Sequence, residues 1–263
     1  MDLGLTDRCV VVTGGSSGIG LAAVRMLLED GARVAFCARG AERLHALAAE
    51  LADAYGADRV LARAFSVLDP DAVAGFAEEV GQTFGGCDAL VTNAGQGRVS
   101  TYADTSDADW REELELKFFS QLHPIRAFEG MLRTSGQGAI VAVNSLLALQ
   151  PEPHMVCTSA ARAGVQNLLK SLATELAPDI RVNSILLGLV DSAQWQRRYE
   201  AREDKAQSRE DWFAALARSK KIPLGRLGQP EEPARAIAFL ASPASSYITG
   251  AKLEISGGVS RFA

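Results

Sequence analysis

The chain alternates short apolar runs with longer segments whose apolar residues recur every three or four positions. Because the apolar runs are continuous and do not alternate with polar residues, they are typical of strands that are covered on both faces. The expected strands are Cys9–Thr13, Arg33–Cys37, Val60–Phe65, Ala89–Thr92, Ala139–Val143, Arg181–Leu186 and Lys252–Ile255.

The segments between these runs have the periodicity of amphipathic helices. One apolar stripe comprises Trp110, Leu114, Phe118, Leu122 and Ile125, and a second comprises Val165, Leu168, Leu169, Leu172 and Leu176. Strands that alternate with helices predict an α/β fold with right-handed crossovers. We therefore expect a Rossmann-type doubly wound domain over residues 1–263, with a seven-stranded, mostly parallel sheet and helices on both faces.

The segment around 192–223 does not follow this alternation. It is helical in pattern, it mixes acidic with basic residues, and it contains Trp195, Tyr199, Trp212 and Phe213. A solvated helical pair with an apolar underside is one interpretation. We favour a lid over the substrate, because insertions at strand ends often cover the site in such sheets. The nearly balanced charges argue against contact with nucleic acid.

Composition narrows the function classes. The net charge of −5 lacks the basic excess of a nucleic-acid surface. The cysteines Cys9, Cys37, Cys87 and Cys157 show neither CxxC nor metal-ligand spacing, so we expect reduced thiols and no metal. The amino terminus has no signal-peptide pattern, and no apolar run is long enough for a membrane span. We expect a cytoplasmic protein that binds a small-molecule substrate.

A glycine-rich turn follows the first expected strand and opens a helix. Glycines allow a sharp turn and a close approach to a pyrophosphate, and the amides at the helix N-terminus attract its charge. A purely structural turn is the alternative, but the strand–turn–helix context favours dinucleotide binding. The expected contacts in Thr13–Gly20 are Gly14, Ser16, Ser17, Gly18, Ile19 and Gly20.

The residue at the end of the second strand selects the cofactor. An acidic side chain there would bond the adenosine ribose and repel a 2′-phosphate. This chain instead has Ala38 and Arg39, with Arg43 one helical turn further. A guanidinium pairs bidentately with phosphate, so we expect NADP(H) in preference to NAD(H). An ordinary surface arginine is the alternative.

Several motifs along the whole chain resemble the short-chain dehydrogenase/reductase family. They are Thr13–Gly20, Asn93-Ala94-Gly95, a serine on the fifth strand, Arg181-Val182-Asn183, Gly188, and the stretch from Ile248 to Gly258. The resemblance implies that Asn93, Ala94 and Gly95 lie beside the cofactor. It also implies that the turn with Gly188 and Ser192 faces the nicotinamide, and that the two striped helices join subunits in a homotetramer.

The family's reaction centre is altered in this chain. The resemblance implies an Asn on the fourth long helix, a Ser, and a Tyr-xxx-Lys pair. The corresponding residues here are Lys117, Ser145, Thr158 and Arg162, which we take as the candidate catalytic residues. An aliphatic hydroxyl is too weak an acid to replace a phenol, and a guanidinium stays protonated near neutral pH. Another group must then supply the proton.

Two side chains are candidates for this proton. Lys117 lies beside the apolar stripe of its helix, although a solvated helix lysine is an alternative. His154, a residue type that can shuttle protons, is the other candidate, although a lone loop histidine is often incidental. Cys157 adjoins the centre without an activating motif, so we expect it to serve packing.

Three hypotheses for function follow. The first is an NADP(H)-dependent oxidoreductase acting on an apolar carbonyl or an enone with a non-standard proton donor. The second is an NADP(H)-binding enzyme with non-redox chemistry. The third is a catalytically silent sensor or scaffold. We favour the first because hydride chemistry belongs to the cofactor and does not depend on the missing tyrosine.

Overall fold

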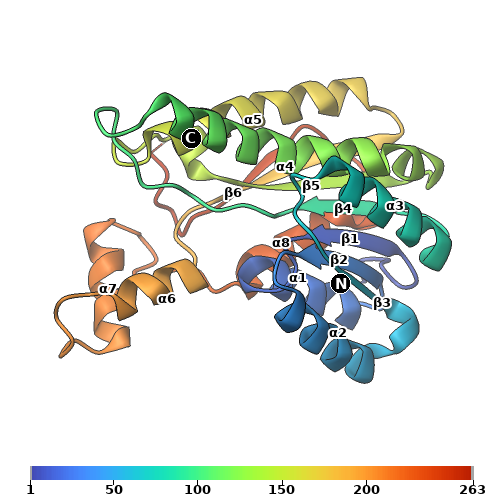
Figure 1. Ribbon diagram of the computed structural model, residues 1–263, viewed down its shortest axis with the longest axis horizontal. Helices are drawn as coiled ribbons and strands as arrows, with labels where there is room; N and C mark the ends of the chain where they lie inside the picture. Colours follow the sequence, from blue (N-terminus) through green and yellow to red (C-terminus); the bar gives the residue numbers. More distant parts are fainter. Residues whose placement is uncertain (1, 262–263) are drawn as a thin grey trace.

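The computed structural model describes residues 2–261. One parallel sheet runs in the order β3-β2-β1-β4-β5-β6-β7 (Figure 1). Its strands are β1 (Cys9–Thr13), β2 (Arg33–Ala38), β3 (Val60–Ala64), β4 (Ala89–Thr92), β5 (Gly138–Ser145), β6 (Ile180–Leu187) and β7 (Lys252–Ile255). The predicted strands and fold class are confirmed, and all six strand pairings are parallel.

Helices cover both faces of the sheet (Figure 1). They are α1 (Gly18–Glu29), α2 (Ala41–Tyr55), α3 (Pro70–Phe84), α4 (Asp107–Thr134), α5 (Val156–Glu175), α6 (Ala193–Glu200), α7 (Arg209–Ser219) and α8 (Glu231–Ala241). Successive side chains of β1 point alternately to the helices on the two faces of the sheet. Val10 and Val12 pack with α1, α2 and α8, whereas Cys9 and Val11 pack with α3, α4 and α5. Both faces of the strands are therefore buried, as their continuous apolar character predicts.

The apolar stripe of α4 and the buried face of this helix differ in its first half. The buried face there carries Glu113, Lys117, Ser120 and Gln121, and it becomes apolar from Pro124 onward. The residues of the apolar stripe lie beside this face, and Leu114 is 40% exposed. Polar pairing among the buried groups has overridden the apolar pattern, and polar side chains therefore lie under the sheet's carboxyl edge.

The strand order reverses direction between β1 and β4, which are adjacent although two strands separate them in sequence. In doubly wound sheets the crevice at such a switch point, beyond the carboxyl ends of the strands, receives the ligand. The glycine-rich turn follows β1 and Asn93-Ala94-Gly95 follows β4. The fold thus brings two of the predicted motifs to one crevice.

Helices α6 and α7 stand out from the layered body (Figure 1). Their aromatic residues pack together: the ring centroids of Trp195 and Trp212 lie 6.3 Å apart, and those of Trp212 and Phe213 lie 5.1 Å apart. A small apolar cluster around Ala217, Ile222 and Leu227 contacts Trp195 and Phe213. The 192–223 segment is therefore a helical pair with an apolar underside.

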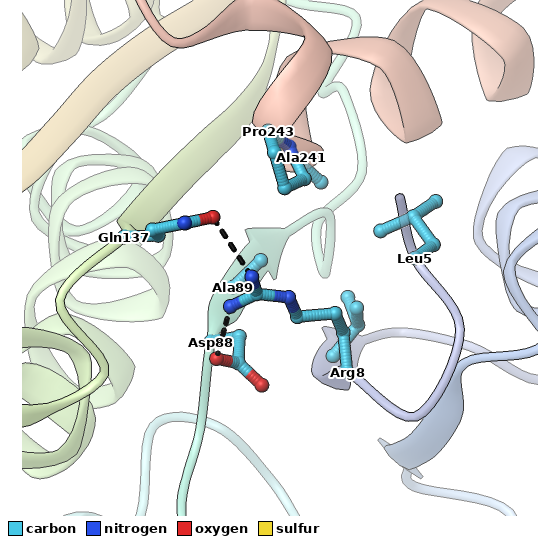
Figure 2. A pocket seen from close by; sticks show the side chains of 8 residues that line it. Leu5, Arg8, Asp88, Ala89, Gln137, Ala241 and Pro243 are labelled. Atoms are coloured by element: carbon cyan, nitrogen blue, oxygen red, sulfur yellow. Dashed lines mark hydrogen bonds and ion pairs between the residues drawn. The ribbon is translucent and has the colours of Figure 1, made fainter. Parts of the chain in front are cut away.

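The opposite, amino edge of the sheet is closed by polar contacts. Figure 2 shows Arg8 reaching Asp88 and Gln137, with bonds of 3.0 Å from Nη1 to Oδ1 and 2.9 Å from Nη2 to Oε1. Asp88 also accepts the Cys9 amide at 2.8 Å. The void beside these residues measures about 10 Å³, room for one water at most. These contacts hold the starts of the strands together, and the void among them is too small for an organic ligand.

Candidate functional site

A cavity of about 520 Å³ lies over the carboxyl ends of β1, β2 and β4; we name it the cradle cavity. The turn between β1 and α1 forms one wall, with Gly14, Ser16, Ser17, Gly18 and Ile19 among its lining residues. Gly14 has φ +70° and a Cβ there would lie 2.9 Å from Ala94 Cα, so the turn requires glycine. The first amides of α1 border this space, where a phosphate would be attracted.

Gly20 is an exception among the predicted cofactor contacts. It is buried beneath the turn and does not line the cradle cavity. A Cβ at Gly20 would lie 2.2 Å from the Gly14 carbonyl oxygen. Asn93 Nδ2 donates to the same oxygen at 3.1 Å and to Thr13 O at 3.0 Å. Gly20 and Asn93 therefore shape the turn from below, and only Asn93 also borders the cavity.

The far end of the cradle cavity is basic. Arg39 and Arg43 line it together with Ala38 and Ser66. Both arginines are exposed, and within residues 2–261 neither has a carboxylate at ion-pair distance. Two guanidinium groups at this wall suit a phosphate better than a sugar hydroxyl pair.

Two further cavities continue the crevice. A central cavity of about 230 Å³ shares Asn93, Ala94, Gly95 and Ser192 with the cradle cavity. An outer cavity of about 750 Å³ adjoins the central one, and both are lined by Gly97, Ser145, Arg162, Leu187, Gly188 and Trp195. The three cavities are neighbours that share lining residues, and Ser145 and Arg162 lie at the boundary between the last two.

Ser145 ends β5 and caps the short turn after it. Its Oγ donates to Leu187 O at 3.3 Å and accepts the Leu147 amide at 3.2 Å. Both bonds are long for a hydroxyl, so the hydroxyl can turn toward a ligand in either adjoining cavity. Ser145, a candidate catalytic residue from the sequence, thus lies where the central and outer cavities meet.

Thr158 lies in the first turn of α5 and borders the outer cavity, but it is fully buried. Its hydroxyl donates to Glu113 Oε1 and accepts the Arg98 amide at 3.0 Å. These contacts hold the hydroxyl against the protein interior. Thr158 therefore joins a buried polar cluster and does not present a proton to the cavities.

Lys117 is the cation of this buried cluster. Its Nζ lies 2.8 Å from Glu113 Oε1, donates to Gln96 O, and lies on the wall of the central cavity. The interpretation as a solvated helix lysine is therefore wrong. Burial lowers the pKa of the Lys117 ammonium, the Arg162 charge lowers it further, and Glu113 opposes both.

Arg162 lies one helical turn after Thr158. Its Nη1 donates to Asn144 Oδ1 at 3.1 Å, while its buried Nε has no hydrogen-bond partner among the described residues. Burial lowers the pKa of the guanidinium to about 10, and Glu113 opposes this shift, so the group remains charged at neutral pH. A buried donor without a partner, at the wall of two cavities, is suited to bind an oxygen of a ligand.

Sequence reasoning missed Glu113, Gln96 and Asn144. Glu113 and Lys117 are spaced i and i+4, which is the spacing of a helix ion pair, and this signal was available. Gln96 acts through its backbone carbonyl, and Asn144 through a contact 18 residues away, so neither leaves a pattern in the sequence.

Two other candidates take secondary places. His154 is exposed and lines the outer cavity, with Nδ1 3.7 Å from Glu152 Oε2. Cys157 is buried and its Sγ lies 3.0 Å from Ser100 Oγ, in keeping with packing. Residues 2–261 contain no group of three His, Cys, Asp or Glu side chains arranged to hold a metal ion. None of the described helices is both long and apolar enough to cross a membrane.

Comparison with known proteins agrees with this geometry. Residues 14–260 match the family model described as enoyl-(acyl carrier protein) reductase. The chain is 35% identical over 260 residues to the acetoacetyl-CoA reductase of Synechocystis sp., covering 98% of each chain.

Two solved structures share the whole fold. One is the NADPH-bound short-chain oxidoreductase of Pseudomonas aeruginosa PAO1, which contains an atypical catalytic center; it is 59% identical, with a TM-score of 0.93 and 99% of each chain covered. The other is the L-sorbose reductase of Gluconobacter frateurii with NADPH and L-sorbose, 33% identical, with a TM-score of 0.94 and complete coverage of both chains. The family-model match and these relatives together place the chain in the short-chain dehydrogenase/reductase family, as an oxidoreductase of that type.

Proposed function

We propose that the protein transfers hydride between NADP(H) and an apolar carbonyl or enone substrate, with Lys117 in the role of proton donor. The observation that carries this proposal is the placement of Lys117, Ser145 and Arg162 on the wall of the central cavity, between the cradle and outer cavities. The cradle fits a dinucleotide because its glycine turn leaves no room for a Cβ and exposes the α1 amides. When bound, the nicotinamide supplies the hydride.

The side chains at the boundary have complementary roles in this proposal. Ser145 donates a hydrogen bond to the substrate oxygen, which becomes more negative during reduction. The Arg162 charge stabilises the same oxygen. The Lys117 ammonium supplies the proton, and Glu113 holds Lys117 beside the central cavity through their contact of 2.8 Å. Apolar residues of the outer cavity, including Leu146, Leu147, Met155 and Leu189, favour a largely apolar substrate body.

The function is tested by adding NADPH and following the absorbance of the reduced nicotinamide. We expect steady oxidation with at least one member of a panel of ketones, quinones and enoyl compounds. NADPH binding without any turnover across the panel would contradict the proposal and support the sensor or scaffold hypothesis. Substrate conversion without a change in nicotinamide absorbance would support the non-redox hypothesis.

We also propose that Arg39 makes the protein prefer NADPH over NADH by at least about tenfold, which corresponds to roughly 1.4 kcal/mol. Arg39 lines the cradle cavity without a carboxylate partner among the described residues, and an Arg–phosphate pair supplies more than this energy. Calorimetric titration of both cofactors measures the preference. Arg39→Ala should abolish most of it by weakening NADPH alone. Equal affinities of the wild-type chain for the two cofactors would refute this prediction.

Three broader features belong to the same proposal. Helices α6 and α7 act as a lid, because Trp195 borders both the central and outer cavities. The exposed Leu114 and Phe119 on α4 suit a homotetramer built on α4 and α5, with closed symmetry burying this surface. The four buried free cysteines suit the reducing cytoplasm.

A further inference from the structure

The outer cavity has a basic rim within an acidic protein. Arg198, Lys220, Lys221 and Arg261 line this cavity and do not border the central one. These cations therefore line the outer cavity alone, whereas Ser145 and Arg162 line both cavities. The chain as a whole has a net charge of −5, so the charge of this rim is opposite in sign to that of the molecule.

The acidic group of this cavity does not neutralise the rim. Glu152, the carboxylate among the described lining residues, has Lys220 Nζ at 3.8 Å and His154 Nδ1 at 3.7 Å. Within residues 2–261, the side chains of Arg198, Lys221 and Arg261 have no carboxylate at ion-pair distance. These three cations are therefore available to pair with an anionic ligand.

Arg198 is positioned by an aromatic ring. Its guanidinium carbon lies 4.6 Å from the centre of the Trp195 ring, within cation–π range. Trp195 in turn borders both the central and the outer cavity. The Trp195 ring contacts only the face of the Arg198 guanidinium. The N–H groups at the edge of the guanidinium therefore remain available to donate hydrogen bonds.

Lys221 has a backbone conformation that glycine normally provides. Helix α7 ends in a Schellman motif, in which the Ile222 amide bonds Ala217 O at 3.0 Å and the Lys221 amide bonds Arg218 O at 3.0 Å. Lys221 therefore occupies the left-handed position of the motif, with φ +53°. Within residues 2–261 only one other non-glycine residue, Asp7, has a positive φ.

The helix dipole does not account for a lysine at this position. A cation, Lys220, already lies at the helix C-terminus, and its φ of −85° is negative. Lys221 is placed in a conformation that is strained for any residue with a Cβ. Strain at a residue that lines a cavity is the kind of departure found at ligand sites. Glycine would relieve this strain but would lack the charged side chain that Lys221 places at the cavity.

We infer that the substrate carries an anionic group, a carboxylate or a phosphate, at the end remote from its reacting carbon. This inference rests on the proposed function and adds the substrate class. The apolar body of the substrate lies along Leu146, Leu147 and Leu189, and its anionic end meets Lys221, Arg198 and Arg261. Charge-assisted bonds from ammonium and guanidinium groups stabilise such an end more than neutral bonds do.

The test measures binding and does not depend on turnover. The chain saturated with NADP⁺ is titrated by calorimetry with octanoate, octanamide and octyl phosphate. We expect octanoate or octyl phosphate to bind at least about tenfold more tightly than octanamide, equivalent to roughly 1.4 kcal/mol. The ratio of the two anions identifies the preferred group. Octanoate and octyl phosphate that bind no more tightly than octanamide, or that do not bind, overturn the inference.

Lys221→Gly tests whether the Lys221 charge contributes to anion binding independently of protein stability. Glycine suits the left-handed position, so the unfolding temperature should stay equal or rise, while affinity for the preferred anion falls about fivefold or more and octanamide is unaffected. Lys221→Arg should retain the affinity. Asp7→Gly relieves the other positive φ at the amino edge of the sheet and should leave the affinity unchanged. Full anion affinity in Lys221→Gly would overturn the assignment of Lys221.

The two proposals fail in different ways. If octanoate binds preferentially and no carbonyl compound oxidises NADPH, the proposed function fails and the anion site stands. If neutral ketones are reduced and the anions show no preference, the anion site fails and the proposed function stands.

Discussion

Lys117→Met is expected to lower kcat for carbonyl reduction by about 10²-fold or more, because it removes the group proposed to donate the proton. Lys117 is buried, it contacts Glu113 at 2.8 Å, and it lines the central cavity. Affinity for NADPH should change little, since the cradle cavity does not include Lys117. Steady-state reduction of the best substrate and calorimetry with NADPH measure the two quantities separately.

Removing Lys117 alone leaves the buried Glu113 carboxylate without its cation, which is strongly destabilising. The double variant Glu113→Gln with Lys117→Met removes both charges and should fold better than Lys117→Met. It should still lose about 10²-fold in kcat. A folded double variant with nearly full kcat would show that the proton comes from elsewhere.

The same assignment gives a pH dependence with a definite sign. The protonated ammonium is the donor in reduction, so kcat should be constant at low pH and fall as pH rises through the Lys117 pKa. Burial and the neighbouring Arg162 charge lower the pKa of Lys117 below the ordinary lysine value of 10.5, so this fall begins at a lower pH than for a solvated lysine. The fall should be absent from the residual activity of the double variant.

Thr158→Val is the matched control in the same cluster. The hydroxyl of Thr158 is bonded to Glu113 and to the backbone of Arg98, so its loss should destabilise the fold by about 1–3 kcal/mol. Because the hydroxyl is not proposed to donate a proton, kcat should change by less than about tenfold. If Thr158→Val abolishes turnover while folding and NADPH affinity remain intact, the proposed mechanism is wrong.

The fold and the cradle were predictable because their signals are local. Each buried strand is a continuous apolar run, and the cradle is one contiguous stretch, Thr13–Gly20, at a strand–helix junction. Gly20 shows the limit of such reasoning: glycine spacing does not reveal whether a glycine faces the ligand or packs under the turn. Its contact with Gly14 O depends on the path of α1 against β1.

The candidate catalytic site was only partly predictable because its residues are distant in sequence. Glu113 and Thr158 are 45 residues apart and meet only because α4 and α5 pack side by side. The apolar stripe on α4 also did not reveal the polar buried face beside it, since the charges of Glu113 and Lys117 are compensated by each other and can be buried. The basic rim combines residues 198, 220, 221 and 261, which no single motif connects.

Ser145→Ala is expected to lower kcat by about 10²-fold, the typical loss when one donor to a developing oxyanion is removed. Ser145 stands at the boundary of the central and outer cavities, and its bonds to Leu187 O and from the Leu147 amide, at 3.3 and 3.2 Å, are weak enough to be exchanged for one to the substrate. NADPH affinity should be nearly unchanged, because Ser145 does not line the cradle cavity. Steady-state kinetics with calorimetry of NADPH separates the two effects.

Ser184→Ala provides the control for loss of a strand hydroxyl in the same sheet. Ser184 lies on the neighbouring strand β6, is buried, and donates to Gln166 Oε1 at 3.0 Å without bordering the three cavities. Its removal should reduce stability by about 1 kcal/mol and leave kcat unchanged. Equal kcat losses in Ser145→Ala and Ser184→Ala would assign the effect to the sheet and not to the substrate oxygen. A loss confined to Ser145→Ala, with KM for NADPH unaffected, is the result that a donor at the cavity boundary requires.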